Sequence, residues 1–122
     1  MGLALASAVA VEVLAAPPAP PGFQLNGDAK RGQALFGKRC ALCHGETGNG
    51  HGRLKIDPAP ADLTAPGVVD KRSDWEIYVV IRDGGPALGL SVKMLAWGKV
   101  VPDQELRDMA AFVRSLAAKP SK

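Results

Sequence analysis

Apolar residues recur at steps of three and four in two widely separated stretches of the chain, which is the spacing of one face of a helix. The first stripe consists of Ala29, Gly32, Phe36 and Cys40. The second consists of Leu106, Met109, Ala110, Val113 and Leu116. The two stripes predict helices over residues 28–39 and 103–117. Asn26 is the expected N-cap of the first helix. Asp103 is expected to cap the second, because Pro102 occupies the usual cap position.

A third helix is predicted between them by a start signal rather than by periodicity. Ser73 is followed three residues later by Glu76, which is the spacing of a capping box. The next residues, WEIYVVI, are rich in β-branched and aromatic side chains, which favour a strand. We give the capping box precedence and expect a helix to about Arg82, ended by Gly84 and Gly85. The sequence therefore predicts an all-α fold of three to four helices connected by long loops.

Proline, glycine and small apolar residues divide the remainder of the chain. Residues 1–16 are almost all small and apolar, which is typical of a signal peptide remnant, with an N-terminal membrane anchor as the alternative. The proline-rich residues 17–26 predict a linker. Residues 27–118 then form one domain. Within it, residues 45–67 are dense in glycine and proline, and a loop of this length in a small domain usually wraps a ligand.

Composition limits the core and the partners of this domain. A chain of 122 residues, 47% of them hydrophobic, is sufficient for one domain, but only 5% are aromatic, so its core is modest. An apolar group bound inside would enlarge that core. The formal net charge is +3, and the basic residues are dispersed rather than interleaved with aromatic ones. We therefore expect no binding to nucleic acid.

Both cysteines of the chain lie in the sequence CALCH, from Cys40 to His44, directly after the first predicted helix. A structural zinc site needs four ligands, and His51 is the one further cysteine or histidine in the sequence. A thioredoxin-type redox pair needs alternating strands and helices around it, and no such pattern is present. Covalent haem attachment accounts for all three residues, because each thiol adds to one vinyl group of the porphyrin and His44 becomes an axial iron ligand. The motif predicts one haem c, bound through two thioethers.

Methionine and histidine residues are the candidates for the second axial ligand. Met94 lies in an aperiodic segment, GLSVKMLAWG, from which its thioether can reach the other face of the haem. Met109 belongs to the apolar stripe of the last helix, where core packing is expected. His51 follows His44 too closely to reach the opposite face. Core packing is also the alternative for Met94.

Taken in order, these motifs resemble those of class I c-type cytochromes of the small bacterial kind. The matching segments are GDAKRGQALFGKRCALCHG, PAPADL, DWEIYVVIRDGG, MLAWG and DQELRDMAAFVRSL, between Gly27 and Leu116. The resemblance implies a cytochrome c-like fold wrapped around one haem. It implies that Cys40 and Cys43 carry the thioethers and that His44 and Met94 are the iron ligands.

The resemblance also assigns roles to residues around the haem. Gly32 and Phe36 match the positions where the first helix crosses the last, with Phe112 as the opposing ring. Pro60, or failing that Pro58, matches a proline whose carbonyl accepts a hydrogen bond from the ring of the histidine ligand. Trp97 matches an aromatic residue beside the haem edge, whose N–H donates a hydrogen bond to a propionate. Leu95 departs from the pattern, since proline often follows the methionine ligand.

A function follows from the same resemblance. If protein atoms fill both axial positions, as the resemblance implies, the iron exchanges single electrons and no substrate reaches it, so we expect a carrier and not an enzyme. Its setting would be a periplasmic respiratory or photosynthetic-type chain, either free or membrane-anchored. The alternatives are a haem c subunit of a larger redox complex and a ligand-binding or catalytic haem with an open sixth position. An acidic docking face is expected on the redox partner, because four basic residues flank the two ligand motifs. These residues are Lys38, Arg39, Lys93 and Lys99.

Overall fold

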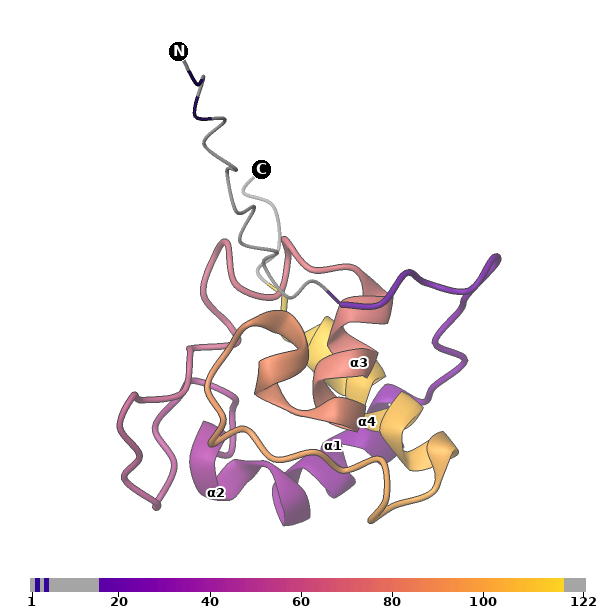
Figure 1. Cartoon of the computed structure of the whole chain (residues 1–122). Coiled ribbons are helices and arrows are strands. Elements are labelled where there is room, and N and C mark those ends of the chain that lie inside the picture. Colours follow the sequence, from indigo (N-terminus) through magenta and orange to yellow (C-terminus); the bar gives the residue numbers. More distant parts are fainter. Residues whose placement is uncertain (1, 3, 5–15, 118–122) are drawn as a thin grey trace.

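The computed structural model describes residues 2, 4 and 16–117, and within them it contains four α-helices, one short 3-10 helix and no strand (Figure 1). In chain order the elements are α1 (Ala29–Arg39), α2 (Ala41–His44), α3 (Asp74–Asp83), the 3-10 helix η1 (Gly85–Leu88) and α4 (Asp103–Ser115). The expected all-α architecture with long connecting loops is confirmed. The predicted signal remnant or anchor, apart from residues 2, 4 and 16, lies outside the described residues.

The start of α1 differs from the prediction. Asp28, not Asn26, is the N-cap, and its side chain accepts a hydrogen bond from the backbone N–H of Arg31 at 2.8 Å. Asn26 lies two residues upstream with a positive φ of 48°. Both residue types cap helices well, so local preference does not choose between them. The choice depends on a tertiary contact, because the backbone N–H of Asp28 donates to the buried carboxylate of Asp108 in α4 at 2.8 Å.

The capping box at the start of α3 is confirmed. The backbone N–H of Glu76 donates to the hydroxyl of Ser73, and the backbone N–H of Ser73 donates to the carboxylate of Glu76, both at 3.1 Å. The helix ends at Gly84, whose φ of 89° suits glycine. The β-branched and aromatic residues of this segment are tolerated in a helix because they supply its buried faces. The buried residues are Ile77, Tyr78, Val79 and Ile81.

Helix α4 begins where the apolar stripe predicts but is not capped as expected. Pro102 is the N-cap and forms no side-chain capping bond. The carboxylate of Asp103 accepts hydrogen bonds from the hydroxyl of Tyr78 at 2.5 Å and from Nε of Arg107 at 2.7 Å, so it links α4 to α3 instead. The helix ends at Ser115, two residues before the predicted end. Met109 is 0% exposed and packs in the core, as expected.

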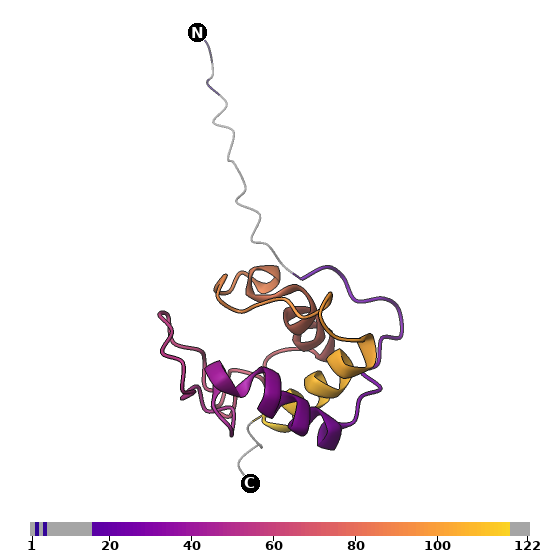
Figure 2. The same ribbon diagram turned by 90° about the horizontal axis from the view of Figure 1, so that it is seen from below.

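Helix α4 joins the two sides of the molecule. It packs against both α1 and α3, whereas no Cα atom of α1 or α2 lies within 8 Å of one in α3 or η1. Figure 2 shows α1 and α2 on one side and α3 with η1 on the other. At the α1–α4 crossing, the rings of Phe36 and Phe112 meet edge to face with centroids 5.0 Å apart, as the sequence predicted. This crossing sets the position of the C-terminal end of α1, which leads into the cysteine motif.

The segment predicted as a linker follows the surface of α3 and α4. The indole N–H of Trp75 donates to the carbonyl of Pro17 at 2.6 Å. The ring of Phe23 packs against Trp75, with centroids 4.8 Å apart, and Arg107 donates to the carbonyl of Gln24 at 2.8 Å. Residues 17–26 therefore contribute to packing on the domain. None of the helices in the described residues has the length and apolarity needed to cross a bilayer.

Candidate functional site

A cavity of about 490 Å³ opens between the two sides of the molecule. Its volume lies in the range of cofactor pockets. Every residue that the sequence singled out for a cofactor role lines it, namely Cys40, Cys43, His44, Pro60, Met94 and Trp97. Much of the remaining wall is apolar, with contributions from Phe36, Ile56, Leu63, Val69, Ile77, Val80, Ile81, Leu88 and Val113. The structure thus brings together side chains from α1, α2, α3, α4 and both long loops.

A single helical turn positions the cysteine motif. The backbone N–H of Cys40 donates to the carbonyl of Phe36 at 2.8 Å, which ends α1, and the N–H of His44 donates to the carbonyl of Cys40 at 2.9 Å. Gly45 follows with a φ of 82°, a conformation that allows the chain to leave α2 at once. As a result, Cys40, Cys43 and His44 all lie on the wall of the same cavity.

The Cys40 thiol does not have the properties of a redox-active or zinc-binding cysteine. Both cysteines are free, and burial raises the pKa of the Cys40 thiol to about 12. Redox and metal-binding cysteines require the opposite shift, toward the thiolate. Within the described part of the chain, no group of three or more His, Cys, Asp and Glu side chains is placed to hold a metal ion. The site therefore fits thioether formation better than either alternative.

The imidazole of His44 lies in the cavity wall and is largely buried. Burial lowers the pKa of its imidazole, so the ring is neutral at pH 7 and carries the lone pair that a metal requires. Its Nδ1 is buried without a hydrogen-bond partner. The predicted hydrogen bond to the carbonyl of Pro60 is therefore not formed. The carbonyl oxygen of Pro60 faces Gly50 instead. A Cβ atom placed on Gly50 would lie 2.7 Å from this oxygen.

Met94 reaches the cavity from the loop between η1 and α4. Its carbonyl accepts a hydrogen bond from the N–H of Gly85 at 3.0 Å, and its N–H donates to the carbonyl of Ser91 at 3.2 Å. The thioether and the imidazole of His44 therefore come from walls formed by different segments. The residues considered as alternatives do not line this cavity: Met109 lies in the core, and His51 lies on another surface.

The charged residues of the cavity wall are all basic. They are Arg39, Lys71, Arg72 and Lys93, and no carboxylate is among the lining residues. Arg72 also pairs with Glu76 at 3.1 Å. Such a wall suits a group that brings its own carboxylates, as haem does with its two propionates. Lys71 and Arg72 could not be predicted from the sequence, because they lie outside every motif and only the fold brings them to the site.

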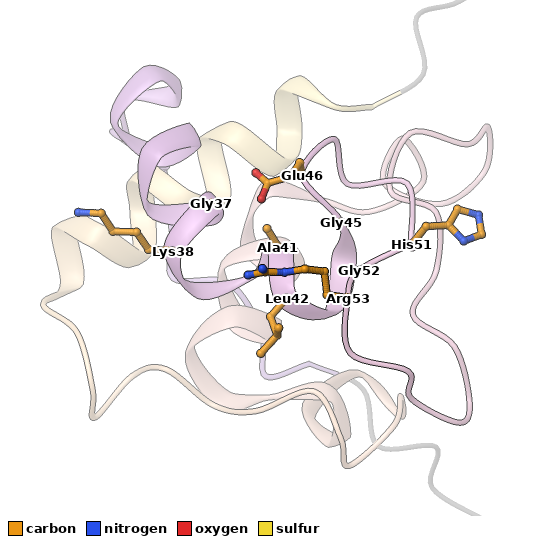
Figure 3. Close-up of a pocket in the computed structure, with 9 residues that line it drawn as sticks. All are labelled: Gly37, Lys38, Ala41, Leu42, Gly45, Glu46, His51, Gly52 and Arg53. Carbon is orange, nitrogen blue, oxygen red and sulfur yellow. The ribbon is translucent and has the colours of Figure 1, made fainter.

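A second cavity of about 410 Å³ lies beside α2 and is lined by neither cysteine nor by Met94. Figure 3 shows Arg53 extending across Ala41 and Leu42, while Lys38 and His51 point away from one another. The side chains of Lys38, Glu46, His51 and Arg53 are exposed. Because it contains none of the candidate attachment residues, this cavity is not the cofactor site.

Comparisons with known proteins agree with the motif and the cavity. The family described as cytochrome c oxidase, cbb3-type, subunit III matches residues 27–113. Among solved structures, a chain of the reducing HAO-like protein complex of Kuenenia stuttgartiensis is similar, with a TM-score of 0.57 and 25% identity over 74% of this chain. The match covers 43% of that chain, so the present chain corresponds to less than half of it.

Proposed function

Since the chain belongs to the family of cbb3-type cytochrome c oxidase subunit III, a c-type cytochrome family, we propose that it carries single electrons through one haem c. In this proposal Cys40 and Cys43 carry the thioethers, and His44 and Met94 are the axial ligands. Haem-based electron transfer is the general activity of a cytochrome c domain. The observation that supports the finer assignment is that two thiols, a neutral imidazole and a thioether line one apolar cavity.

Each residue of the site has a separate task in this proposal. Haem bound here supplies an iron that takes up and releases one electron. Cys40 and Cys43 fix the group to α2 and prevent its loss. His44 provides a nitrogen lone pair, and Met94 provides a soft, neutral sulfur that stabilises the ferrous state. The apolar wall keeps water away, so the surroundings rearrange little when the charge changes.

Filled axial positions favour a carrier over an enzyme or a gas-binding protein. With His44 and Met94 both bound, carbon monoxide has no free position, so the reduced protein should bind it slowly or not at all. Met94→Ala should bind it rapidly. Met109→Leu changes a buried methionine outside the cavity and should behave like the native protein. Rapid binding by the native protein would instead support the open sixth position.

The partner is proposed to be a redox protein with an acidic docking face. Lys38, Arg39, Lys93 and Lys99 are all exposed, and Arg39 and Lys93 also line the cavity. Positive charges at the edge of the site attract an acidic partner and orient it toward the cofactor.

A second candidate function is that of a haem c subunit within a larger redox complex. The match covers only 43% of the similar solved chain, which belongs to a complex, and the matching family is an oxidase subunit. Gel filtration of protein released under mild conditions distinguishes the two. A free carrier elutes near the mass of its 12.7 kDa chain, whereas a subunit elutes with its partners.

We propose a periplasmic or otherwise extracytoplasmic location, with or without an N-terminal membrane tether. Domains of this family are typically extracytoplasmic. Cell fractionation tests the compartment. The mass of the purified protein tests whether residues 1–16 are removed.

A further inference from the structure

The two proposed axial ligands belong to different parts of the molecule. We call α1, α2 and residues 45–67 the histidine half, and α3, η1 and residues 89–101 the methionine half. Helix α4 packs against α1 and α3, but no Cα atom of α1 or α2 lies within 8 Å of one in α3 or η1. The halves are thus joined through α4, and residues of both halves line the cavity.

Backbone hydrogen bonds attach the loop that bears Met94 to its own half. The N–H of Trp97 donates to the carbonyl of Ile81, and the N–H of Gly98 donates to that of Arg82, both at 2.9 Å. The carbonyl of Met94 accepts from Gly85 of η1 at 3.0 Å. These bonds fix the loop relative to α3 and η1. They do not fix its separation from His44, which lies on the other half.

Two side-chain contacts cross from the methionine half to the histidine half. The guanidinium of Arg39, at the end of α1, lies over the ring of Trp97, 5.6 Å from the centroid. The amine of Lys93 donates a hydrogen bond to the backbone carbonyl of Asp57. Arg39, Lys93 and Trp97 all line the cavity, and the first two are exposed, so both contacts lie at its rim. One bridge is formed by the residue before Met94 and the other by the third residue after it.

We propose that Arg39 and Lys93 are positioning residues that hold the loop over residues 89–101 against the histidine half and so keep Met94 within reach of the iron. The inference rests on the proposed His44 and Met94 ligation. The loop has particular need of such contacts, because Leu95 follows Met94 and does not restrict the backbone as a proline would. When either bridge is lost, conformations in which the loop has moved away become more populated, and the sixth position opens to external ligands.

The test uses the full-length haem protein and the variants Arg39→Ala, Lys93→Ala and their combination. Two properties report on the Met94 sulfur: the weak far-red absorption of ferric iron bound to sulfur, and the rate of carbon monoxide binding to the reduced protein. Each single variant should weaken the absorption and raise the rate by about threefold to tenfold, and the double variant by more than either. Lys93→Arg keeps a hydrogen-bond donor and should retain most of the native behaviour.

Matched controls separate positioning from loss of charge. Lys30→Ala removes an exposed cation from the same helix as Arg39, and Lys55→Ala removes one from the loop that contains Asp57. Both should keep the native absorption and the native rate. If Arg39→Ala and Lys93→Ala also keep them while haem remains covalently bound, the positioning role is refuted and the proposed function stands. If the native protein itself lacks the sulfur-to-iron absorption, the proposed ligation fails and the inference fails with it.

Discussion

Gly32 of α1 and Asp108 of α4 approach so closely that a Cβ atom on Gly32 would lie 1.8 Å from the backbone carbonyl oxygen of Asp108. One turn further along α1, Phe36 packs edge to face on Phe112. The two helices therefore cross with their backbones in near contact. Because α1 leads directly into Cys40 and α2, this crossing determines where the attachment motif stands relative to the rest of the cavity.

Replacement of Gly32 by alanine should destabilise the fold. The added methyl group meets backbone atoms of α4, which cannot move aside without separating the helices, and we expect a loss of about 2–3 kcal/mol in the free energy of unfolding. Gly37→Ala is the matched control on the same helix, because a Cβ there meets nothing within 4 Å. That variant should gain about 0.5–1 kcal/mol from helix propensity. Urea unfolding measures the stability of both variants. Equal stability of the two would contradict the close approach of α1 and α4 at Gly32.

Asp108 should make the stability of the fold sensitive to acid. Its side chain is 2% exposed, and hydrogen bonds from Arg31, at 2.9 Å to Nε, and from the backbone of Asp28 lower the pKa of its carboxyl. Because the folded pKa lies below the unfolded value of about 3.9, this stabilisation is present above that value and is lost as the pH falls through the folded pKa.

Asp108→Asn should therefore lower the free energy of unfolding by about 2 kcal/mol at pH 7. The difference in the free energy of unfolding between this variant and the native protein should shrink as the pH falls below about 4. Glu105→Gln removes the same charge from α4 and serves as the control. A difference between native and Asp108→Asn that is constant with pH would show that the carboxylate is not the stabilising group.

Phe23→Ala should loosen the segment that precedes α1. The ring lies 4.8 Å from that of Trp75 and 5.6 Å from that of Tyr78, centroid to centroid, and Arg107 lies over its face. Since Phe23 is half-buried, we expect a loss of about 1–2 kcal/mol, less than for a fully buried ring. Hydrogen exchange of the backbone amides of residues 22–27 should accelerate in this variant and stay native in Gln24→Ala, whose side chain is exposed. Native exchange in Phe23→Ala would mean that the ring does not hold the segment.

The helices and the motif could be predicted because their signals are local. The stripes on α1 and α4 and the capping box at Ser73 each involve residues that are close in sequence. The reciprocal hydrogen bonds between Ser73 and Glu76 outweigh the strand preference of the residues that follow. Cys40, Cys43 and His44 are likewise adjacent. The cavity wall contains all of the residues singled out from the sequence for a cofactor role, although their chemical roles remain proposals.

What the sequence did not predict depends on contacts between distant residues. Asp28 rather than Asn26 caps α1 because Asp108, 80 positions away, accepts its backbone N–H. The proline-rich segment packs on the domain because Trp75 donates to Pro17. Lys71 and Arg72 line the cavity because the loop before α3 folds against it. The contact between Arg39 and Trp97 joins two segments that no single sequence motif contains.

The charge at the edge of the site should control reaction with small oxidants. With the anionic oxidant hexacyanoferrate(III), the rate of oxidation should fall as ionic strength rises, because salt screens the attraction to the exposed basic residues. With a cationic cobalt(III) phenanthroline complex it should rise. Lys99→Glu should reduce the salt dependence for both, because it replaces an exposed cation. If neither oxidant responds to ionic strength, the basic residues have no steering role.

Extraction of the purified native protein with acidified organic solvent tests the central claim most directly, because thioether-bound haem stays with the polypeptide and non-covalent haem does not. We predict that the red colour remains with the protein and that the denatured mass exceeds that of the chain by one haem. Cys40→Ala and Cys43→Ala together should release the pigment or prevent its binding. A native protein that loses its pigment to the solvent, or never contains one, would contradict covalent attachment at Cys40 and Cys43.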